Sequence, residues 1–597
     1  MSEKILPGTV ICRLPACEEE KFVKFSEPLS VFEAWEPKDV IRVLDAVENA
    51  TKEGQYAAGY ITYEASSAFD DSYSVFSCSD SPLIWFGIYD KYENFIIDGK
   101  EQFKKRDFDL ESEISETDYL NIIESIKKHI ENGDIYQANF TYRLNCPVEL
   151  PLNDDYLKLF IYILEHHPVP YGAFVDTGKN KILSFSPELF IEKKGKRIVS
   201  RPMKGTAPRG LSSERDYQYK KDLHFDEKNR AENLMIVDMV RNDLGRICNI
   251  GSVKVERLFE VQSFFTVHQM ISEISGILPE EISIADIFKS LFPAASITGA
   301  PKIMAMYLIN KYELSPRKVY TGSIGCVLPC GDLCFNIAIR TLIVNNGSGE
   351  LGIGSGIVAD SVHEEEWQEC ILKSKFLKPH SRNMDFKLLE TILWEPEKGF
   401  KYLDEHLNRI CGSARRFGWK CSKEQFLESL NEKISALGDD VREYMRVRLL
   451  FSPVEGISSE FIKIESPGWV NKSYVKITLS DKKTSSNNIF LYHKTTNRCL
   501  YNTSFKHSLS QGWDEVIFRN EKNEITEGAI SNIFIRKEGK WFTPPIECGL
   551  LPGIWRSKII QQLNAECKIL YISDLIEADE ILVGNSVRGE GKGILFI

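Results

Sequence analysis

The sequence predicts an α+β protein made of two consecutive parts, with mixed sheets in both. Short runs such as GYITYEA and LIWFGIYD alternate apolar and polar residues in the manner of strands. Amphipathic stretches such as TDYLNIIESIKKHIEN, at residues 117–132, have the apolar spacing of helices. The polar segment HSRNMD, at residues 380–385, interrupts both patterns. We therefore expect a domain over residues 1–379, a linker over 380–385 and a second domain over 386–597.

The predicted elements follow a simple order along the chain. Strands dominate up to about residue 110, and the helix at 117–132 is expected to end at Gly133, which can serve as a C-cap. Short strands then alternate with long helices to about residue 378. The segment FKLLETILW, which starts at Phe386, opens a second strand-rich region with helices of its own.

Length and composition exclude several classes of protein. A chain of 597 residues is too long for one hydrophobic core. Its 74 basic and 86 acidic residues give a net charge of −12, which provides no footprint for nucleic acid or an anionic membrane. We find no signal-peptide pattern and no apolar stretch of about 20 residues. The 14 cysteines lack CxxC pairs, as expected of reduced thiols. These features indicate a cytoplasmic protein without a nucleic-acid or membrane partner.

Several carboxylates lie in helical sequence patterns of the first part. Glu366 and Glu369 are i,i+3 neighbours in HEEEWQECILKSK, and Lys373 follows at i+4 from Glu369. Glu232 lies in the apolar run NRAENLMIVDMVRNDLGRI, where neighbours such as Leu234 indicate burial. Glutamates that converge from two helices would suit Mg²⁺. A solvated acidic face is the alternative for residues 364–369.

Two loops and three glycine-containing segments supply further candidates. Glu188 follows a strand in SFSPELF, and Lys204 lies between Pro202 and Gly205, where the backbone is restricted. A partly desolvated lysine can act as a nucleophile, although an isolated lysine is usually a surface residue. The segments SITGAPK, IRTL and GIGSGIVADS offer hydroxyls, Arg340 and backbone N–H groups to an anion. None of them matches a dinucleotide-binding or Walker A pattern.

The ordered motifs of the first part resemble those of the chorismate-utilising enzymes. The resemblance covers most of residues 1–378, with a core at about 115–378, and rests on these segments: GDIYQANF, SPELF, RPMKGTAPRG, RAENLMIVDMVRNDLGRI, SITGAPK, YTGSIG, IRTL, GSGIVADS and the Glu366/Glu369 helix. It implies a fold of large mixed or antiparallel sheets with flanking helices.

Two residues indicate a branch within that family. Members that add water to chorismate usually carry a lysine base at the position of Gln137, so Gln137 resembles the ammonia-using branch. Anthranilate synthases usually read PIAGT, whereas aminodeoxychorismate synthases often read PIKGT, and this chain reads PMKGT around Lys204. Replacement of Ile by Met is tolerated in volume. The resemblance therefore favours amination of chorismate to 4-amino-4-deoxychorismate.

The same resemblance implies roles for individual residues. Glu232 and Glu369, with Glu366 nearby, would hold Mg²⁺ against the ring carboxylate. Lys204 would add at C2 while Glu188 protonates the departing C4 hydroxyl, and ammonia would then enter at C4. The residues expected to bind chorismate are Gln137, His268, Thr298, Gly299, Ala300, Tyr320, Arg340, Gly354, Ser355, Gly356 and Lys373. The chain contains no Gly-x-Cys-x-Gly nucleophile elbow, so ammonia is expected from a separate glutamine amidotransferase subunit or from free ammonia.

The second part offers the components of a pyridoxal-phosphate (PLP) site. Lys494 lies in LYHKTTNRCLY at the end of a predicted strand, and Glu527 in ITEGAISNIF. The segment GLLPGIWRSKIIQQL places a helix start at Gly553, where free N–H groups favour phosphate. Arg409 and the turn GNSVRG could add further contacts. Taken singly, each residue also has an ordinary structural explanation.

As an ordered set, these residues resemble fold-type IV PLP enzymes over residues 386–597, which implies a two-subdomain α+β domain. Lys494 would be the Schiff-base lysine and Glu527 the partner of the pyridine nitrogen. Trp555 replaces a threonine that is common in transaminases, so that only a backbone N–H contact would remain. The residues expected to bind PLP are Arg409, Lys494, Glu527, Asn532, Gly553, Ile554, Trp555, Asn585 and Ser586.

Fold-type IV alone does not separate lyases from transaminases. The segment LLETILWEPEKGFKYLDEHLNR resembles the start of aminodeoxychorismate lyases, and the first module would make the substrate of such a lyase. The expected products are 4-aminobenzoate, for folate biosynthesis, and pyruvate, with a homodimer through the PLP domain left open. One alternative is anthranilate synthase component I fused to a branched-chain or D-amino acid aminotransferase-like domain. Another is a catalytically degenerate scaffold for a glutaminase subunit.

Overall fold

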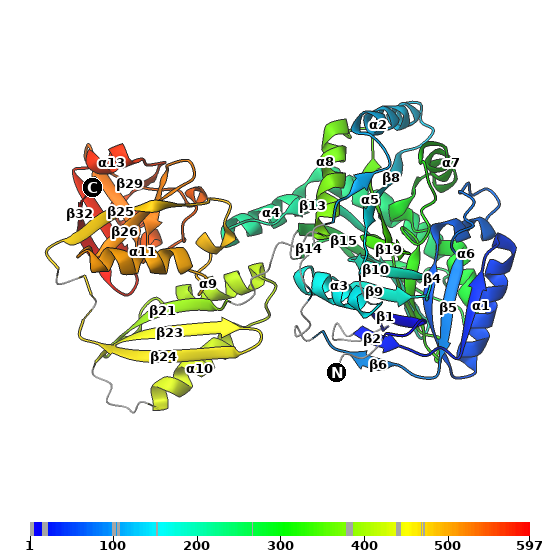
Figure 1. Cartoon of the computed structure of the whole chain (residues 1–597), viewed down its shortest axis with the longest axis horizontal. Helices are drawn as coiled ribbons and strands as arrows, with labels where there is room; N and C mark the ends of the chain where they lie inside the picture. The colour runs from blue at the N-terminus through cyan, green and yellow to red at the C-terminus, as the bar shows by residue number, and fades with distance from the viewer. Residues whose placement is uncertain are drawn as a thin grey trace. The chain divides into compact units, whose positions relative to one another are not determined.

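The computed structural model describes residues 5–14, 22–97, 103, 108–150, 153–264, 267–377, 386–436, 443–466, 468–469 and 472–596. The predicted linker, residues 380–385, lies outside these ranges. The chain forms two compact units, of which unit 1 comprises Met1–Pro208 and Lys220–Arg382, and unit 2 comprises Arg209–Tyr219 and Asn383–Ile597. Both units combine helices with sheets (Figure 1), which confirms the predicted α+β class.

Two large sheets form the centre of unit 1, and every described strand pair in them is antiparallel. The first sheet has the order β16 (Gly299–Ala300), β8 (Gln137–Pro147), β20 (Ser348–Ile357), β19 (Thr341–Asn345), β10 (Asn180–Ser186), β9 (Tyr171–Asp176), β1 (Thr9–Arg13), β2 (Phe22–Phe25) and β6 (Glu93–Phe95), with β7 (Glu111–Ser112) beside β8. The second has the order β13 (Met203–Pro208), β15 (Val267–Ile277), β12 (Arg197–Arg201), β11 (Leu189–Lys194), β18 (Leu333–Asn336), β17 (Ser323–Val327), β4 (Tyr56–Ile61), β5 (Ile84–Tyr89) and β3 (Ser30–Ala34), with β14 (Lys254–Ser263) beside β15.

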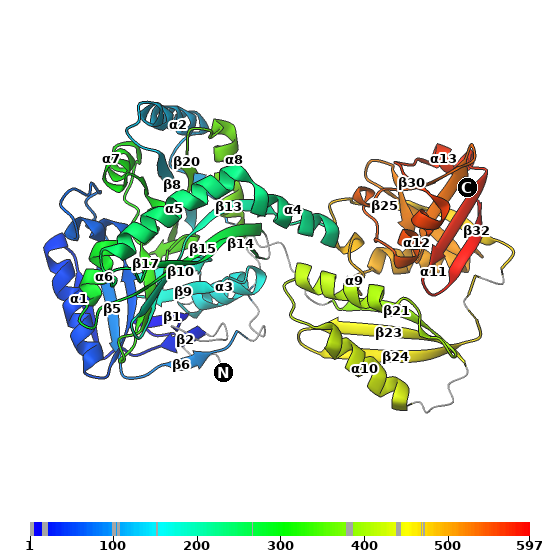
Figure 2. The same ribbon diagram turned by 180° about the vertical axis from the view of Figure 1, so that it is seen from behind.

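Helices cover the outer face of each sheet, so unit 1 has four layers (Figures 1 and 2). The first sheet is covered by α2 (Glu116–Glu131), α3 (Asn153–His166), α7 (Lys302–Tyr312) and α8 (His363–Ser374). The second is covered by α1 (Pro37–Lys52), α5 (Glu227–Gly245) and α6 (Ile284–Leu291). The remaining helical segments are α4 (Ser213–Phe225), η1 (Tyr63–Ala68), η2 (Ala295–Ile297) and η3 (Lys375–Leu377).

The central strands of unit 1 are buried on both faces, because one face packs against helices and the other against the second sheet. Along β1, Val10 and Cys12 belong to the core between the sheets, whereas Ile11 belongs to the core under the helices. The same alternation places Val175 between the sheets and Phe174 under the helices. This burial explains why many strands of unit 1 are apolar at consecutive positions.

The helix predicted at residues 117–132 is α2, which ends one residue earlier than expected. Ser115 caps its N-terminus by accepting a hydrogen bond from the Asp118 N–H at 3.1 Å. Asn132 is the C-cap, and Gly133 follows it with φ of +79°. A residue without Cβ tolerates this left-handed backbone, so the glycine acts just after the predicted position.

Unit 2 contains two sheets with separate cores. The smaller sheet has the order β22 (Gly399–Phe400), β21 (Leu388–Glu395), β23 (Tyr444–Ser452) and β24 (Gly456–Ile464), and it packs against α9 (Leu403–Arg416) and α10 (Lys423–Ala436). The larger has the order β27 (Ile525–Gly528), β26 (Glu515–Asn520), β25 (Val475–Thr484), β32 (Gly589–Leu595), β31 (Glu580–Asn585), β28 (Asn532–Lys537), β29 (Lys540–Thr543) and β30 (Glu566–Cys567). Its helical segments are α11 (Cys499–Ser510), α12 (Ile554–Leu563), α13 (Ile572–Ile576), η4 (Ile489–Leu491) and η5 (Ile546–Cys548).

Parallel pairing in the described residues is confined to this larger sheet, where β25 runs parallel to β26 and β32, and β29 to β30. Unit 2 also includes Arg209–Tyr219, a segment that the sequence-based boundaries assign to the first domain.

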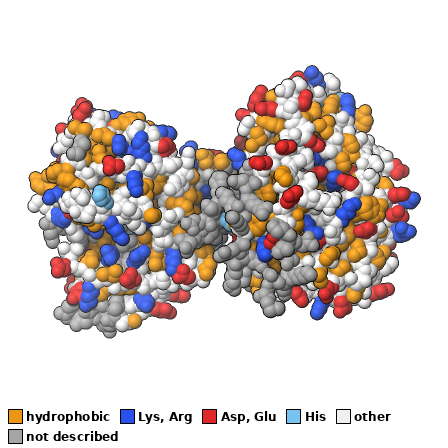
Figure 3. Space-filling view, viewed as in Figure 1, with side chains coloured by type: hydrophobic (Ala, Val, Ile, Leu, Met, Phe, Trp, Pro, Cys, Tyr) orange, Lys and Arg blue, Asp and Glu red, His pale blue; other side chains and the backbone are white. Residues whose placement is uncertain are grey.

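The surface agrees with the mixed charge of the sequence. On the face shown in Figure 3, Lys and Arg side chains are interspersed with Asp and Glu over both units. Within the described residues, no helix combines the length and apolar character that crossing a bilayer requires.

A buried ion pair joins several segments of unit 1. Arg317 and Glu313 are both almost fully buried, and the Arg317 guanidinium contacts the Glu313 carboxylate at 2.7 Å. The same guanidinium donates to the Ile297 carbonyl at 2.8 Å and to the Asn139 carbonyl at 2.7 Å. Glu64 accepts the Arg317 backbone N–H at 2.7 Å. Because these bonds satisfy most of the buried polar atoms, loss of the guanidinium would leave carboxylate and carbonyl oxygens unpaired.

We predict that Arg317→Met destabilises unit 1 by about 3–5 kcal/mol, because it leaves the Glu313 charge buried without its partner. Native-state hydrogen exchange of the β8 amides measures this loss. The matched control is Arg241→Met, since Arg241 pairs with Asp238 on the exposed surface of α5 and should cost less than about 1 kcal/mol. Equal effects of the two substitutions would contradict a stabilising role for the buried pair.

Candidate active sites

The first candidate site lies at the ends of β13, β8 and β20. Lys204, on β13, directs its amine over Gly356 and next to the Gln137 amide, so that a Cβ at Gly356 would lie less than 3.0 Å from both groups. Glycine at this position therefore permits the close approach. The Gln137 side chain is fully buried, and among the described residues neither of its polar atoms has a hydrogen-bond partner. A buried amide in that state is suited to a polar ligand.

The protonation of Lys204 is set mainly by its surroundings. Burial lowers the pKa of the amine, an effect that the carboxylate of Glu232 opposes and the ammonium of Lys373 reinforces. No ion pair joins Lys204 to another side chain in the described part of the protein. A lysine in this environment has a larger neutral, nucleophilic fraction than a lysine in water.

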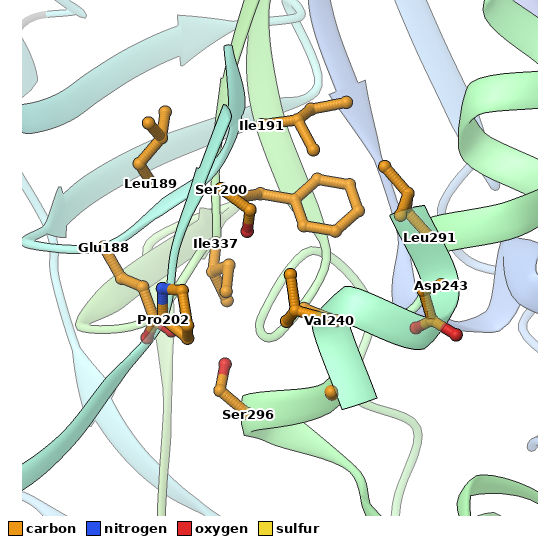
Figure 4. Close-up of a pocket in the computed structure, with 13 residues that line it drawn as sticks. Glu188, Leu189, Ile191, Ser200, Pro202, Val240, Asp243, Leu291, Ser296 and Ile337 are labelled. Atoms are coloured by element: carbon orange, nitrogen blue, oxygen red, sulfur yellow. The ribbon is translucent and has the colours of Figure 1, made fainter. Parts of the chain in front are cut away.

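Glu188 lies in the turn between β10 and β11, and its side chain is buried. Its Oε1 accepts the Met203 N–H at 3.3 Å. Burial raises the pKa of this carboxyl to about 7, although the nearby Ser296 hydroxyl, the Met203 N–H and Lys204 lower it. Figure 4 shows the small pocket beside Glu188, into which Ser296 directs its hydroxyl. Glu188 can therefore hold a proton near neutral pH, as a general acid must.

The three candidate metal ligands lie on two helices. Glu232 belongs to α5, and Glu366 and Glu369 belong to α8. Burial raises the pKa of Glu232, the amines of Lys204 and Lys228 lower it, and the like charges of Glu366 and Glu369 add to the rise. Glu232, which the apolar run led us to expect as buried, is half-buried, and its neighbour Leu234 is 44% exposed.

Lys373 forms an ion pair with the Glu369 carboxylate. Its amine contacts Glu369 Oε1 at 2.7 Å and donates to the Gly354 carbonyl at 2.8 Å. Although burial acts in the opposite direction, Lys373 holds the pKa of Glu369 below its usual value. Among the described residues, no three His, Cys, Asp or Glu side chains are grouped closely enough to hold a metal ion. The donors fit Mg²⁺ in kind, but a metal would require them to draw together and Glu369 to turn from Lys373.

Arg340 is a candidate for binding a substrate carboxylate. It precedes β19 with φ of +51°, a left-handed conformation that is strained for a residue with a side chain. Burial lowers the pKa of the guanidinium to about 10. In the described part of the chain no carboxylate pairs with Arg340, so its buried charge remains available to an anion.

Tyr320 and His268 also lie in buried positions. The Tyr320 ring covers Gly352 and stacks on the Arg143 guanidinium at 5.3 Å. Burial raises the pKa of Tyr320 to about 12, so its hydroxyl remains a donor. His268, on β15, contacts the Ser263 hydroxyl at 2.9 Å through Nδ1. It is paired in register with Ala207 at the end of β13, three residues beyond Lys204.

The remaining candidates for chorismate binding line β8 and β20. Ala300 is paired with Gln137 and Gly299 with Ala138. The Thr298 hydroxyl donates to the Ala294 carbonyl at 3.1 Å, which leaves it only as an acceptor for a ligand. Ser355 is fully buried, and its hydroxyl contacts Tyr119 at 2.9 Å on the helix-covered side of the sheet. Ser355 thus has a structural partner already, whereas Gly354 meets Lys373 through its carbonyl.

The second candidate site surrounds Lys494 in unit 2. The lysine lies in a loop after η4 and not at the end of a strand, so that part of the expectation is wrong. An isolated bridge between Leu388 and Thr495, and a bond from the Leu389 N–H to the Lys494 carbonyl at 2.9 Å, fix this loop beside β21. Burial lowers the pKa of the amine to about 7, and Arg498 and Arg409 lower it further.

Glu527 is buried on β27 and held by two side chains. Tyr501 donates to Oε1 at 3.1 Å and Asn532 donates to Oε2 at 3.2 Å. Burial raises the pKa of this carboxyl to about 7, although Arg498, these donors and Lys494 lower it. A carboxylate fixed in this way can face a protonated ring nitrogen.

Arg409 on α9 belongs to a buried network that the sequence patterns do not reveal. It makes a bidentate contact with Glu390 at 2.8 and 2.7 Å, and it donates to the Pro552 carbonyl at 3.3 Å. His406 contacts Glu390 at 2.6 Å, and its Nε2 has no partner in the described residues. Although burial alone would raise it, Arg409 and His406 hold the pKa of Glu390 at about 2. Glu390 thus positions the Arg409 guanidinium beside the start of α12.

The start of α12 supplies backbone donors. Gly553 is the N-cap and makes no side-chain cap, so the first N–H groups remain available to a phosphate. A Cβ at Gly553 would collide with Asn532 Oδ1. The Trp555 ring packs under Gly584 and against Phe534, and so offers the site only its backbone.

The turn after β31 is organised by Asn585. Its Oδ1 accepts the Val587 and Arg588 N–H groups at 3.0 and 2.8 Å, and its Nδ2 donates to the Ile530 carbonyl at 2.9 Å. Asn585 therefore shapes the turn, whereas the half-buried Ser586 has its hydroxyl available to a ligand.

Sequence reasoning did not select Glu390, His406, Arg498 and Tyr501. The available signal for the last two was their position, since Arg498 follows Lys494 by four residues and Tyr501 lies in the first turn of the helix that follows. Arg498 stacks on the Tyr501 ring at 5.4 Å and donates to the Ala529 carbonyl. Taken together, an amine with a low pKa, a fixed carboxylate, a positioned arginine and an uncapped helix start fit PLP.

Comparisons with known proteins find similar sequences for both parts of the chain. The E. coli (strain K12) protein named aminodeoxychorismate synthase component 1 is 39% identical over 265 residues, which is 44% of this chain and 58% of that protein. Anthranilate synthase component 1 of Aquifex aeolicus (strain VF5) is 34% identical over 302 residues, 48% of this chain and 60% of that protein. The chain thus spans little more than half the length of these two relatives.

A crystal structure of anthranilate synthase component I from Streptococcus pneumoniae TIGR4 superposes with a TM-score of 0.53 at 26% identity, covering 61% of this chain and 93% of that chain. Residues 98–379 match the family of chorismate binding enzymes, and residues 387–591 match amino-transferase class IV, which implies PLP as a cofactor. The chain therefore joins a region that matches the family of chorismate binding enzymes to a region that matches amino-transferase class IV.

Proposed function

We propose that the chain converts chorismate and ammonia to 4-amino-4-deoxychorismate in residues 1–379, and then to 4-aminobenzoate and pyruvate in residues 386–597, with a linker at 380–385. The observation that carries the first step is the approach of the Lys204 amine to the buried Gln137 amide over Gly356. The higher identity to a protein named aminodeoxychorismate synthase than to one named anthranilate synthase supports the choice of product.

In the proposed amination, the neutral Lys204 amine forms a bond to C2 of chorismate while the ring double bond moves and the C4–O bond breaks. Glu188 donates its proton to the departing hydroxyl, which leaves as water. Ammonia then bonds to C4 while the ring double bonds return to their first positions, and the C2–N bond breaks to return the electron pair to Lys204. The new C4 ammonium gives its extra proton to the Glu188 carboxylate, which restores the acid. Covalent catalysis of this kind divides one difficult displacement into two easier ones.

The two carboxylates of chorismate need fixed cations and donors. Arg340, whose charge has no described partner, would bind one of them, and Lys373 would bind another once it releases Glu369. Glu232, Glu366 and Glu369 would hold Mg²⁺, which supplies Lewis-acid stabilisation of the substrate's negative charge. Tyr320, His268, Thr298 and the backbone of Gly299, Ala300, Gly354, Ser355 and Gly356 would complete the walls.

In the proposed elimination, PLP supplies an electron sink for the carbon that carries the amino group. Lys494 would hold the cofactor and later remove the proton from C4 of the substrate. Glu527 would face the ring nitrogen, positioned by Tyr501 and Asn532. Arg409, Ser586 and the N–H groups of Ile554 and Trp555 would bind the phosphate. Loss of pyruvate from the neighbouring carbon leaves an aromatic ring, which drives the step.

The proposal includes a separate glutamine amidotransferase chain as the source of ammonia. Its support is the absence of a Gly-x-Cys-x-Gly element from the sequence and the printed name of the E. coli relative, which is component 1 of its enzyme. We also propose a cytoplasmic location, because all thirteen described cysteines are free thiols. A homodimer through the PLP domain is part of the same proposal, on family resemblance alone.

Replacement of the proposed nucleophile should abolish amination. We predict that Lys204→Ala lowers the rate of chorismate amination by on the order of a thousandfold or more, because the covalent route is lost. Chorismate binding, measured by calorimetry, should persist. Lys221→Ala, which removes an exposed lysine of α4, is the control and should retain full turnover. Near-normal turnover of Lys204→Ala would exclude this lysine as the nucleophile.

The pH dependence of amination should report Glu188 and Lys204. A general acid must be protonated, so with a pKa of about 7 the Glu188 carboxyl should produce a decline in turnover above neutral pH. The lowered pKa of Lys204 should produce a rise at lower pH, as the amine loses its proton. The measurement is the chorismate kcat/KM at constant concentration of free ammonia. A rate that continues to rise well above pH 7 would rule out Glu188 as the acid.

Product analysis tests the order of the two reactions. With chorismate, ammonia, Mg²⁺ and PLP, we expect 4-aminobenzoate and pyruvate in equal amounts. Lys494→Ala should lose the absorbance of bound PLP and accumulate 4-amino-4-deoxychorismate, whereas Lys506→Ala, on the exposed face of α11, should behave as the natural protein. Anthranilate as the product would overturn the first half of the proposal, and a transaminated product would overturn the second.

A further inference from the structure

The segment Arg209–Tyr219, which we call the strap, packs in unit 2 although it lies between β13 and α5 in the chain. It contains the turn after β13 and the first half of α4. The strap begins five residues after Lys204 and ends 13 residues before Glu232, so both of its ends lead to proposed residues of the first site. The matched class IV region begins only at residue 387, and the strap is outside it.

The strap has a defined shape of its own. Arg209 makes a bidentate ion pair with Asp216 at 2.7 and 2.9 Å, and the guanidinium is almost fully buried. Asp216 also accepts the Gly210 N–H at 2.8 Å. A Cβ at Gly210 would collide with the backbone of Asp216, so the turn is tight as well as paired. Bidentate arginine–carboxylate pairs of this kind fix geometry as well as charge.

Three further contacts attach the strap to the rest of unit 2. Arg416, at the end of α9, donates from Nε to the Gly210 carbonyl at 2.6 Å. Ser213 packs so closely on Gly412 that a Cβ there would approach its hydroxyl to 3.2 Å. Leu211 packs against the apolar cluster that contains Leu491, Tyr492 and Tyr501.

The strap also bonds to His493, the residue directly before Lys494. The Leu211 carbonyl lies 2.9 Å from His493 Nε2, and the Ser413 hydroxyl lies 2.9 Å from Nδ1. Burial, reinforced by Arg416, lowers the pKa of His493 to about 4, so the ring is neutral at physiological pH. A carbonyl can only accept, which requires the proton on Nε2 and leaves Nδ1 to accept from Ser413. One ring therefore joins the strap, α9 and the Lys494 loop.

We propose that the strap is a positioning element of the PLP site, which holds the Lys494 loop in place through the Leu211–His493 hydrogen bond. The inference rests on the proposed role of Lys494. The residues that face the Lys494 amine electrostatically are Arg498, Arg409, Glu390 and Glu527, and none of them belongs to the strap. The strap thus acts by fixing the backbone on which the amine is carried, and not through its own charge.

The test is the pH dependence of PLP capture by the full-length chain after removal of the cofactor, followed by absorbance. Only the neutral amine captures PLP, so the midpoint in the natural protein should lie near pH 7. A loosened loop exposes the amine to water and raises the midpoint, so we expect capture at pH 6 to slow by about tenfold in His493→Phe. Asp216→Ala, which removes the ion pair with Arg209 at a distance from Lys494, should slow capture by a similar factor. The variant that combines His493→Phe with Asp216→Ala should be little slower than either one alone.

Matched variants separate this role from general damage. Glu214→Ala removes an exposed carboxylate of the strap and should leave the midpoint unchanged. His493→Gln keeps a donor and an acceptor and should restore much of the natural midpoint. Chorismate amination by Asp216→Ala should persist, which would show that the chain is folded. Unchanged midpoints in both His493→Phe and Asp216→Ala would overturn the strap inference alone, whereas failure of the natural chain to capture PLP would overturn the proposed function of unit 2.

Discussion

A guanidinium buried between the layers of unit 1 joins the segments on which the first site is built. Arg317 bonds to the carbonyl of Asn139 on β8 and to that of Ile297 in η2. The chain on one side leads to Gln137 and on the other to Thr298, so Arg317 supports the spacing that the β16–β8 pairing sets. A buried arginine requires a carboxylate to offset its desolvation, and Glu313 meets that requirement. The geometry around Gln137 and Thr298 therefore depends in part on the ion pair that offsets the desolvation of Arg317.

Desolvation also sets the chemistry at both sites. The amines of Lys204 and Lys494 have lowered pKa values, and the carboxyls of Glu188 and Glu527 have raised ones, in each case mainly through burial. A lysine and a glutamate with opposite shifts approach each other in acidity, which lowers the cost of moving a proton from one to the other. Two unrelated folds have thus reached the same electrostatic arrangement by enclosing a base and an acid in low dielectric.

The features predicted most accurately from the sequence are those that a short segment determines by itself. The α+β class is confirmed, and α2 lies within one residue of its predicted range because its cap and apolar spacing are local features. Lys204 and Gln137, both selected from local motifs, lie next to each other over Gly356. Long-range packing is less accessible: Leu234 faces solvent within an apolar run, and Lys494 lies in a loop fixed by a bridge to Leu388. Glu390 could not be assigned from sequence, because its partners lie 16 and 19 residues away on another element.

The strap shows that the two units are not simply joined end to end in the chain. The chain passes between the units three times, at residues 208/209, 219/220 and 382/383. Segments of the two units therefore alternate along the polypeptide, and no single cut divides the chain into two complete units. A gene split at the interdomain linker would leave eleven residues of one module encoded within the other. Such an arrangement makes the two units difficult to separate in evolution, since unit 2 on its own would need a substitute for a segment that lies within the sequence of unit 1.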